Sequence, residues 1–479
     1  MIKKKTIRIL DEVNFSNYIS KKTDLNKIKS AARKVLISME TKPKDYRLHV
    51  DNVHKFMGAL WTKYDCKDIY EILDDLTCLE PALLDIERDP ESGRIYRDHY
   101  VHLFHVFIDG FRIISAIVNK LSVKEARKIF KIQDESLQSR IKGYDKDGSP
   151  TEFKDYTWKE RLFYIWSIIS TLHDIAIPLT HLEKICNALN TFSKHFHLEI
   201  SGPFLAPSFP SDLDNYLDLL SRIFQGKLQP GKEEDWRYDK KISNSYVKGY
   251  LERLFLEKNH GVLGGFLVYK KIEEIFLCGR SKCSLSPDSF LKYKEIILEE
   301  DIARAALAIS LHDLGTSETF GVKDTINNDK FKKPKFMPIR FNDYPLTFLL
   351  ILADSLQECL RWEGKSIRGN SKLQDFPEIR LEIDDDKHIK VEYNLFLSDD
   401  SEEQHYFCNA VKDLYDKKKV SPSGSTITDA ANDLTRYLEA EITQKLFLND
   451  YLSLSLSFYE GDKKHLLCKQ PFKTKRIDR

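Results

Sequence analysis

Histidine and aspartate recur beside apolar segments of this chain, a pattern that suits the binding of divalent metal ions. The centre of the set is the adjacent pair His173 and Asp174, which follows the apolar residues 165–172. An imidazole and a carboxylate from neighbouring positions can hold one divalent ion, and the second carboxylate oxygen remains for another. Four similar segments add His102, His260, His312 and Asp354. Two cations held by these ligands would lower the pKa of a bridging water and so favour hydrolysis of a phosphate ester or anhydride.

Residues 95–118 contain three histidines at successive three-residue steps, His99, His102 and His105. Because this segment has the periodicity of a helix, the three side chains fan across one side of it. We predict that His102 binds metal. For His99 and His105, contact with the substrate and a purely structural role both remain open.

Asp174 follows an apolar run in which a lone carboxylate would be costly to bury. A metal cation is the simplest partner, and the alternative is that Asp174 caps a helix beginning near Pro178. His260 precedes Gly261, Gly264 and Gly265 within a helix-like segment. Glycine is unfavourable inside a helix, so these positions indicate the close approach of a substrate or of a neighbouring helix.

A basic segment with interleaved aromatic residues lies between His312 and Asp354. It contains Lys330, Phe331, Lys332, Lys333, Lys335, Phe336, Arg340 and Phe341. Such a segment is suited to holding a polyphosphate and stacking a base, and the alternative is a solvated charged loop. Arg94 and Arg97, shortly before His102, are further candidates for phosphate contact.

Helical periodicity dominates the chain, as in residues 29–39, 68–86 and 243–277. The pattern changes near residue 375. Residues 378–396 alternate apolar and polar positions around an acidic turn, which predicts a β-hairpin. Helices near 404–418 and 429–447 and a strand at 451–459 complete a small α+β unit. We therefore expect a mainly α protein with three parts: a helical extension at 1–90, the metal-binding domain at 91–374, and an α+β domain at 375–479.

Composition limits the classes of partner. Lys and Arg total 75 against 74 for Asp and Glu, so net charge gives no strong signal for nucleic acid or for an acidic membrane. The N-terminus lacks the apolar middle of a signal peptide, and apolar runs such as residues 346–353 are too short to cross a bilayer. Eight cysteines without a compact framework predict reduced thiols and a cytoplasmic protein.

The ordered series His, His-Asp, His, His, Asp resembles the HD superfamily of metal-dependent phosphohydrolases, over roughly residues 96–361. The resemblance implies an HD-type helical domain whose core site is His102, His173, Asp174 and Asp354, with His260 and His312 holding a second ion and Asp174 bridging the two. Many HD enzymes follow the dipeptide with Gly-Lys or Gly-His, whereas this chain continues Ile175-Ala176-Ile177-Pro178. The catalytic acid is therefore open among His181, His99 and His105.

The expected cofactor is a pair of divalent ions. Imidazole with carboxylate ligands suits Mn, Fe, Zn, Ni or Co, and Mg is open for a weaker second site. The expected substrate is a nucleotide, and the leading activity is deoxynucleoside triphosphate triphosphohydrolysis. The alternatives are a phosphodiesterase of cyclic mono-, di- or oligonucleotides, a non-catalytic nucleotide sensor, and a di-iron oxygenase. Self-association and an allosteric nucleotide are also open.

Overall fold

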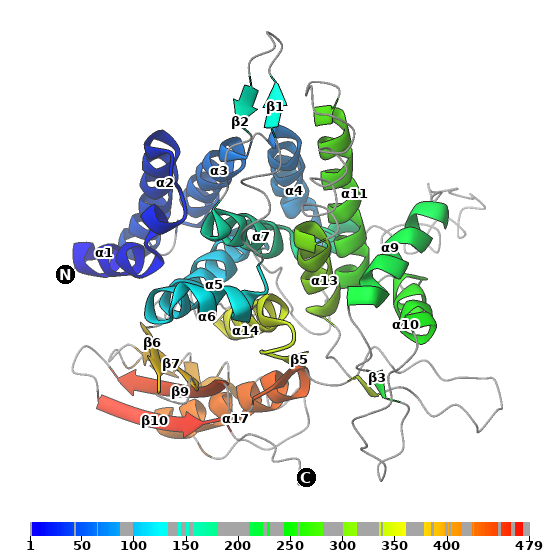
Figure 1. The fold of residues 1–479 in the computed structure, drawn as a ribbon. Helices are drawn as coiled ribbons and strands as arrows, with labels where there is room; N and C mark the ends of the chain where they lie inside the picture. Colours follow the sequence, from blue (N-terminus) through cyan, green and yellow to red (C-terminus); the bar gives the residue numbers. More distant parts are fainter. Residues whose placement is uncertain are drawn as a thin grey trace, which may run out of the picture. The chain divides into compact units, whose positions relative to one another are not determined.

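The computed structural model of the protein is mainly α-helical with a small mixed four-stranded sheet near the C-terminus, which confirms the predicted fold class (Figure 1). The structure describes residues 2–42, 45–64, 66–86, 99–132, 142–144, 150–152, 157–179, 210–223, 228–229, 244–256, 259–280, 300–313, 335–336, 339–360, 378–384, 388–397, 401, 404–405, 407–409, 411–412, 424, 426–448, 452–460 and 465–472.

Backbone contacts divide the chain into two compact units. The first comprises Met1–Gln133, Thr157–Thr171 and Arg340–Arg479, and the second comprises Asp134–Tyr156 and Leu172–Ile339. The boundaries that we expect at residues 91 and 375 remain a prediction, because this grouping does not test them.

The first unit contains most of the helices and the four-stranded sheet. Its helices are α1 (Ile2–Val13), the 3-10 helix η1 (Phe15–Asn17), α2 (Lys22–Thr41), α3 (Tyr46–Lys63), α4 (Lys67–Ile86), α5 (His99–Lys120), α6 (Val123–Phe130), α7 (Trp158–Leu172), α14 (Pro345–Leu360) and α17 (Ile427–Lys445). Its strands are β6 (Glu378–Ile383), β7 (Ile389–Leu397), β8 (Leu446–Phe447), β9 (Leu452–Glu460) and β10 (His465–Pro471). The chain returns to this unit through β5 (Ile339–Arg340).

Aromatic side chains form the centre of the first unit around α5 and α7. Phe15 packs against Phe107, Phe111 and Phe163, with ring centroids 6.5, 6.2 and 6.0 Å away. Trp166 of α7 lies directly over Gly110 of α5, where an added Cβ would come within 2.1 Å of the indole. The close approach of the two helices therefore requires glycine at position 110. This close contact holds α7 against α5, and His173 directly follows α7.

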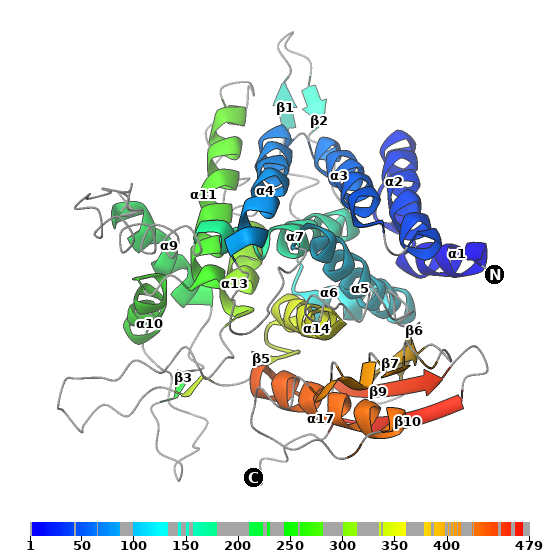
Figure 2. The same ribbon diagram turned by 180° about the vertical axis from the view of Figure 1, so that it is seen from behind.

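The sheet has the order β10-β9-β7-β6. β6 and β7 pair antiparallel, which confirms the predicted hairpin, and β9 and β10 also pair antiparallel. β7 and β9 run parallel, so the connection between them must cross over, and it contains α17. Thr426 and Asp429 form a capping box that starts α17. Figures 1 and 2 both show α17 beside the sheet, and it packs against β10 and α14.

The second unit is helical, with short strand pairs. Its elements are β1 (Lys142–Tyr144), β2 (Pro150–Glu152), α9 (Pro210–Ile223), β3 (Leu228–Gln229), α10 (Asn244–Leu256), α11 (His260–Arg280), α13 (Ala303–Leu311) and β4 (Lys335–Phe336). α11 and α13 lie side by side and pack closely against each other. β3 and β4 pair antiparallel, so Lys335 and Phe336 of the basic segment lie in a short strand.

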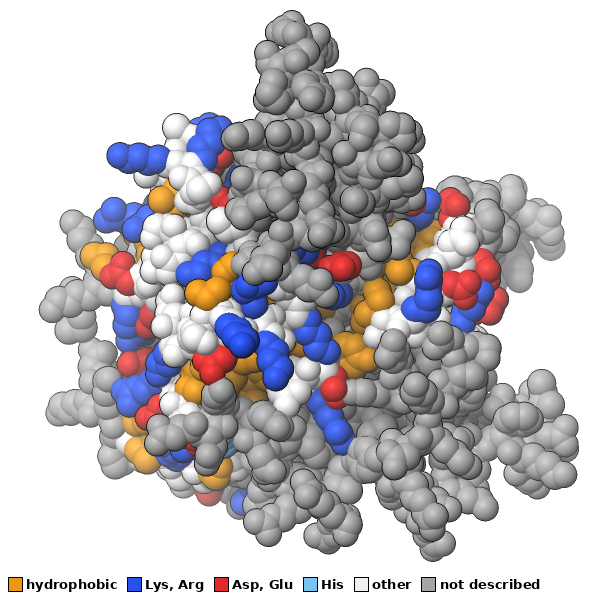
Figure 3. Space-filling model, viewed as in Figure 1, with side chains coloured by type: hydrophobic (Ala, Val, Ile, Leu, Met, Phe, Trp, Pro, Cys, Tyr) orange, Lys and Arg blue, Asp and Glu red, His pale blue; other side chains and the backbone are white. Residues whose placement is uncertain are grey.

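Two segments, Tyr100–Lys120 and Trp158–Leu179, are long and apolar enough to cross a bilayer by length and composition alone. Polar residues such as His102, His105 and Asp109 interrupt the first segment, so it contains no unbroken apolar run of that length. Most of each segment, 94% and 72%, is buried inside the structure, which is the burial expected of core helices. The described surface in Figure 3 carries both basic and acidic side chains, in keeping with the balanced composition.

Candidate metal centre

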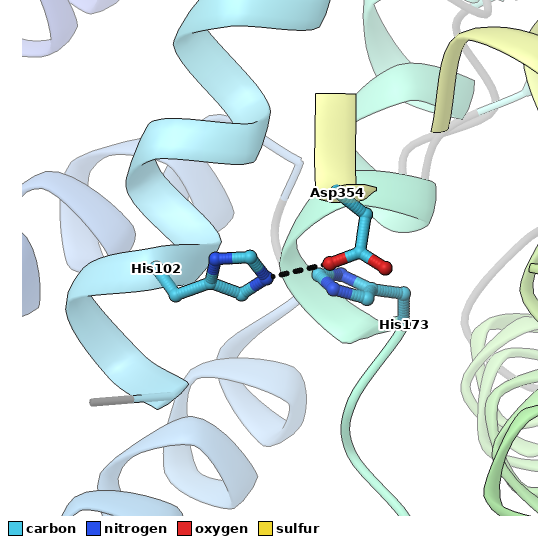
Figure 4. Close-up of side chains that lie close together, drawn as sticks. All are labelled: His102, His173 and Asp354. Carbon is cyan, nitrogen blue, oxygen red and sulfur yellow. Dashed lines mark hydrogen bonds and ion pairs between the residues drawn. The ribbon is translucent and has the colours of Figure 1, made fainter. Parts of the chain in front are cut away.

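A first group of ligand-type side chains contains His102 of α5, Asp354 of α14, and His173, which directly follows α7. The His102 Nε2 atom lies 2.9 Å from Asp354 Oδ1. One ligand atom from each of the three residues lies within 4.8 Å of the others. Figure 4 shows the three side chains pointing toward one another. All three residues are buried, and such a group of two imidazoles and a carboxylate can hold a metal ion.

A second group contains Asp174, His260 and His312, and its ligand atoms also lie within 4.8 Å of one another. Asp174 Oδ1 lies 3.9 Å from His260 Nε2 and 3.7 Å from His312 Nε2. Asp174 is 6% exposed, so its carboxylate has left water and needs partners of opposite charge or hydrogen-bond donors. Because His173 and Asp174 are consecutive residues, one peptide bond joins the two groups.

The two imidazoles of the second group are held with their Nε2 atoms facing each other, 3.2 Å apart. The Nδ1 atom of His312 lies 2.6 Å from the carbonyl oxygen of Ile309, and Nδ1 of His260 lies 3.2 Å from Asp313 Oδ2. An oxygen acceptor at Nδ1 selects the tautomer that has its proton there, which leaves a lone pair on Nε2. Two lone pairs at this distance repel each other unless a proton or a metal cation lies between them.

The donor set therefore fits a cation. Two nitrogen ligands at about 2.0–2.1 Å from one tetrahedral ion lie roughly 3.3 Å apart, close to the observed separation of the two Nε2 atoms. Mixed imidazole and carboxylate ligands suit Mn, Fe, Co, Ni or Zn.

Close packing of α11 against α13 brings His260 and His312 together. A Cβ added at Gly265 would lie 2.2 Å from Ser310 Oγ and 2.6 Å from the carbonyl oxygen of Ala306. A Cβ at Gly261 would meet backbone oxygens of α13 in the same way. The glycines thus serve the approach of a neighbouring helix, one of the two causes that the sequence left open.

A buried hydroxyl pair lies at the same helix contact. Tyr216 of α9 and Ser310 of α13 are joined by a hydrogen bond of 2.9 Å between their hydroxyl groups. Burial raises the pKa of Tyr216 far above its usual value of 10, although the bond to Ser310 acts in the opposite direction. The tyrosine therefore stays protonated and neutral beside α11.

Sequence reasoning missed Asp313 and Asn259. The Asn259 side chain donates from Nδ2 to Asp313 Oδ2 at 3.1 Å, and its Oδ1 accepts from the backbone N–H of Val262 at 3.0 Å. Asn259 thus caps α11 and also holds the carboxylate that orients His260. The sequence does contain an indication of Asp313, because His312 and Asp313 repeat the His-Asp dipeptide of His173 and Asp174.

A buried ionic network lies on the two helices that supply His102 and Asp354. Arg112 of α5 contacts Asp109 at 3.2 Å and Glu12 of α1 at 2.6 Å. Gln357 of α14, three residues beyond Asp354, donates to the Asp109 carboxylate. The network links α1, α5 and α14 within the first unit.

The other predicted site residues remain predictions. His105 is buried on α5 but belongs to neither group, and Arg340 is half-buried in β5. His99 begins α5 and Lys335 lies in β4, but their side chains are outside the described residues. The remaining candidates fall wholly outside the described residues: His181, Arg94, Arg97, Lys330, Phe331, Lys332 and Lys333.

Comparison with known proteins adds no assignment. No protein-family model, no curated protein and no solved structure matches the chain. What is shown is a mainly helical protein with two buried His/Asp groups that can bind metal.

Proposed function

We propose that the protein is an HD-type metal-dependent phosphohydrolase of nucleotides, and specifically a deoxynucleoside triphosphate triphosphohydrolase. The observation on which the proposal rests is the pair of buried His/Asp groups joined through His173 and Asp174. The order of their residues along the chain is that of the HD superfamily, which supports the family assignment.

The residues named above have separate tasks in this proposal. His102, His173 and Asp354 would hold one ion, and Asp174, His260 and His312 the other. The ions would supply Lewis-acid stabilisation of phosphate oxygens and favour ionisation of water. Asp313 and the Ile309 carbonyl oxygen would keep the His260 and His312 rings oriented toward the second ion.

The test is a hydrolysis assay with full-length protein, added Mn²⁺, and a panel of deoxynucleoside triphosphates and cyclic nucleotides. Release of inorganic triphosphate is the expected result. Asp174→Asn should abolish it, whereas Asp214→Asn, an exposed carboxylate on α9, should leave it unchanged. Absence of hydrolysis across the whole panel would overturn the proposal.

A second candidate is a phosphodiesterase of cyclic nucleotides. Two neighbouring metal groups support it as well as they support the first, because two ions can stabilise both the attacking and the leaving oxygen. Linear nucleotide as the product of the same assay would select it. A shift in melting temperature with one nucleotide, without any hydrolysis, would instead indicate a non-catalytic sensor.

A further inference from the structure

A cluster of one histidine, one aspartate and two tyrosines lies where α3, α4 and α5 meet, and it shares no residue with the two metal groups. The hydroxyl group of Tyr70 on α4 is hydrogen-bonded to Nε2 of His54 on α3. Nδ1 of His54 lies 3.5 Å from Asp74 Oδ1 and 3.4 Å from the hydroxyl oxygen of Tyr100 on α5. Both ring nitrogens of His54 therefore face oxygen atoms.

Helix packing brings these side chains together. α4 packs against both α3 and α5. Tyr70 and Asp74 are four residues apart on α4, so their side chains lie on the same side of the helix. His54 and Gly58 have the same spacing on α3, and a Cβ added at Gly58 would lie 3.2 Å from the Tyr70 ring. The glycine leaves room for the phenol ring, whose centroid lies 4.9 Å from that of the His54 imidazole.

The two nitrogens of His54 have different tasks. A carboxylate can only accept a hydrogen bond, so Asp74 favours the tautomer that has its proton on Nδ1. Nε2 then carries the lone pair and accepts the hydrogen bond that the Tyr70 hydroxyl group donates. A hydroxyl group, an imidazole and a carboxylate in this order form the arrangement by which many enzymes activate a nucleophile.

Tyr70 needs such a base in order to react. Burial raises the pKa of its hydroxyl group above the usual value of 10.0, and the negative charge of Asp74 acts in the same direction. The hydroxyl group therefore keeps its proton at neutral pH and attacks an electrophile only when a base removes that proton. The side chains of His54 and Asp74 are 29% and 55% exposed, so a small molecule can reach the cluster from solvent.

The charge of α4 limits the class of substrate. The helix contains six acidic residues and one lysine, so its surface repels phosphates and other anions. An uncharged electrophile is not repelled. Carboxylic esters are uncharged electrophiles that a hydroxyl nucleophile attacks at the carbonyl carbon.

We propose that Tyr70 is a nucleophile that takes the acyl group of an uncharged, activated carboxylic ester, with His54 as its general base and Asp74 as a positioning residue. The Tyr70 oxygen forms a bond to the carbonyl carbon, and the bond from that carbon to the leaving oxygen breaks. The Tyr70 proton passes to Nε2 of His54 and then to the leaving oxygen. The products are an acyl ester on Tyr70 and a free alcohol. This reaction does not depend on the proposed phosphohydrolase activity.

The probe is p-nitrophenyl acetate, added to the full-length protein, and peptide mass spectrometry measures the initial rate of acetylation at each tyrosine. Tyr459 is the internal reference, because it is half-buried like Tyr70 but packs against Phe396 and has no histidine partner among the described residues. We expect Tyr70 to be acetylated about 100-fold faster than Tyr459, which is the contribution of a general base.

Two histidine variants test the base. His54→Gln should bring the rates at Tyr70 and Tyr459 to within about threefold of each other, because the base is lost. His405→Gln removes an exposed histidine of the same unit and should leave the ratio of the two rates unchanged.

Added imidazole separates the chemical role of His54 from a structural one. His54→Ala opens a space at a partly exposed side chain, so free imidazole should enter it and raise the rate at Tyr70 relative to Tyr459. Asp74→Asn should lower this ratio less than the His54 variants do, because it acts only on the orientation of the ring. Asp174→Asn should leave the ratio unchanged, so failure of the proposed phosphohydrolase activity would not affect this result.

Melting temperatures near that of the wild type would show that the His54 variants are folded. Equal rates of acetylation at Tyr70 and Tyr459 in the wild type would overturn the proposal. An unchanged ratio in His54→Gln would also overturn it, as would the failure of imidazole to raise the ratio in folded His54→Ala.

Discussion

At the scale of single residues, the two nitrogens of each imidazole in the second metal group have different tasks. His260 and His312 each place Nδ1 near an oxygen acceptor, and this arrangement directs both Nε2 atoms to the same point. The acceptor for His260 is Asp313, which is itself held by Asn259. Metal affinity should therefore depend on a carboxylate that need not touch the ion.

Replacing Asp313 with asparagine tests this dependence. Because the variant keeps the shape but loses the charge that orients His260, we expect metal affinity to fall about 10- to 100-fold. Competition with a chromogenic chelator measures the affinity. Asp218→Asn removes an exposed carboxylate from the same unit and should have no effect. Equal affinities for Asp313→Asn and the wild type would refute the orienting role.

The buried Arg112 network predicts a large loss of stability from one substitution. Arg112→Met leaves the carboxylate of Asp109, which is 1% exposed, without its cation. We expect the free energy of unfolding to fall by about 3 to 5 kcal/mol in denaturant titrations. Arg380→Met removes an exposed guanidinium from its pair with Glu378, which also contacts Arg8, and should cost less than about 1 kcal/mol. Similar losses for both variants would contradict the network.

At the scale of elements, glycines set the separation of α11 and α13, and hence that of the histidines on them. Gly265→Ala would force a methyl group against Ser310 and Ala306. We expect a loss of about 1 to 3 kcal/mol in unfolding free energy, together with weaker metal binding. Gly249→Ala in α10 is the matched control, since nothing lies within 4 Å of its added Cβ. That variant should gain roughly 0.5 to 1 kcal/mol. Equal changes in stability and metal binding for the two variants would show that the separation of α11 and α13 does not control the metal group.

Glu160, in the first turn of α7, is expected to make the free energy of unfolding depend on pH. Burial opposes ionisation of Glu160, but hydrogen bonds from Ser20 and Thr157 outweigh it and hold the pKa of this carboxyl below its ordinary value of 4.5. A pKa that is lower in the folded state contributes stability above 4.5, and this contribution is lost as pH falls through the folded-state pKa.

Glu160→Gln should therefore lower the unfolding free energy most at pH values above 4.5. The difference from the wild type should shrink as the solution is made more acidic, in a series of denaturant titrations. A difference that stayed constant with pH would mean that ionised Glu160 does not stabilise the start of α7.

The alternation of apolar and polar residues predicted where the strands lie, but it did not predict which strands pair with each other. Alternation at residues 378–396 and 451–459 identified β6, β7 and β9, because Leu381, Val391 and Leu454 are buried between more exposed polar neighbours. The parallel pairing of β7 with β9 depends on where α17 returns the chain, and no short pattern encodes it. In the same way, burial singled out Asp174 as needing a partner, but the role of Asp313 depends on the packing of α11 against α13.

At the scale of the whole molecule, the metal groups draw their ligands from distant parts of the sequence. His102 and Asp354 are 252 positions apart and yet lie in hydrogen-bond contact. Such contacts form only after long segments of chain have been ordered, a cost that metal binding would offset in the folded state. The protein should consequently contain tightly bound metal when purified.

The most direct test is the metal content of the purified wild-type protein and of His173→Ala/Asp174→Ala, measured by mass spectrometry of the elements. We predict about two equivalents of divalent transition metal in the wild type and well under one in the variant. Equal metal content in two folded proteins would contradict the account.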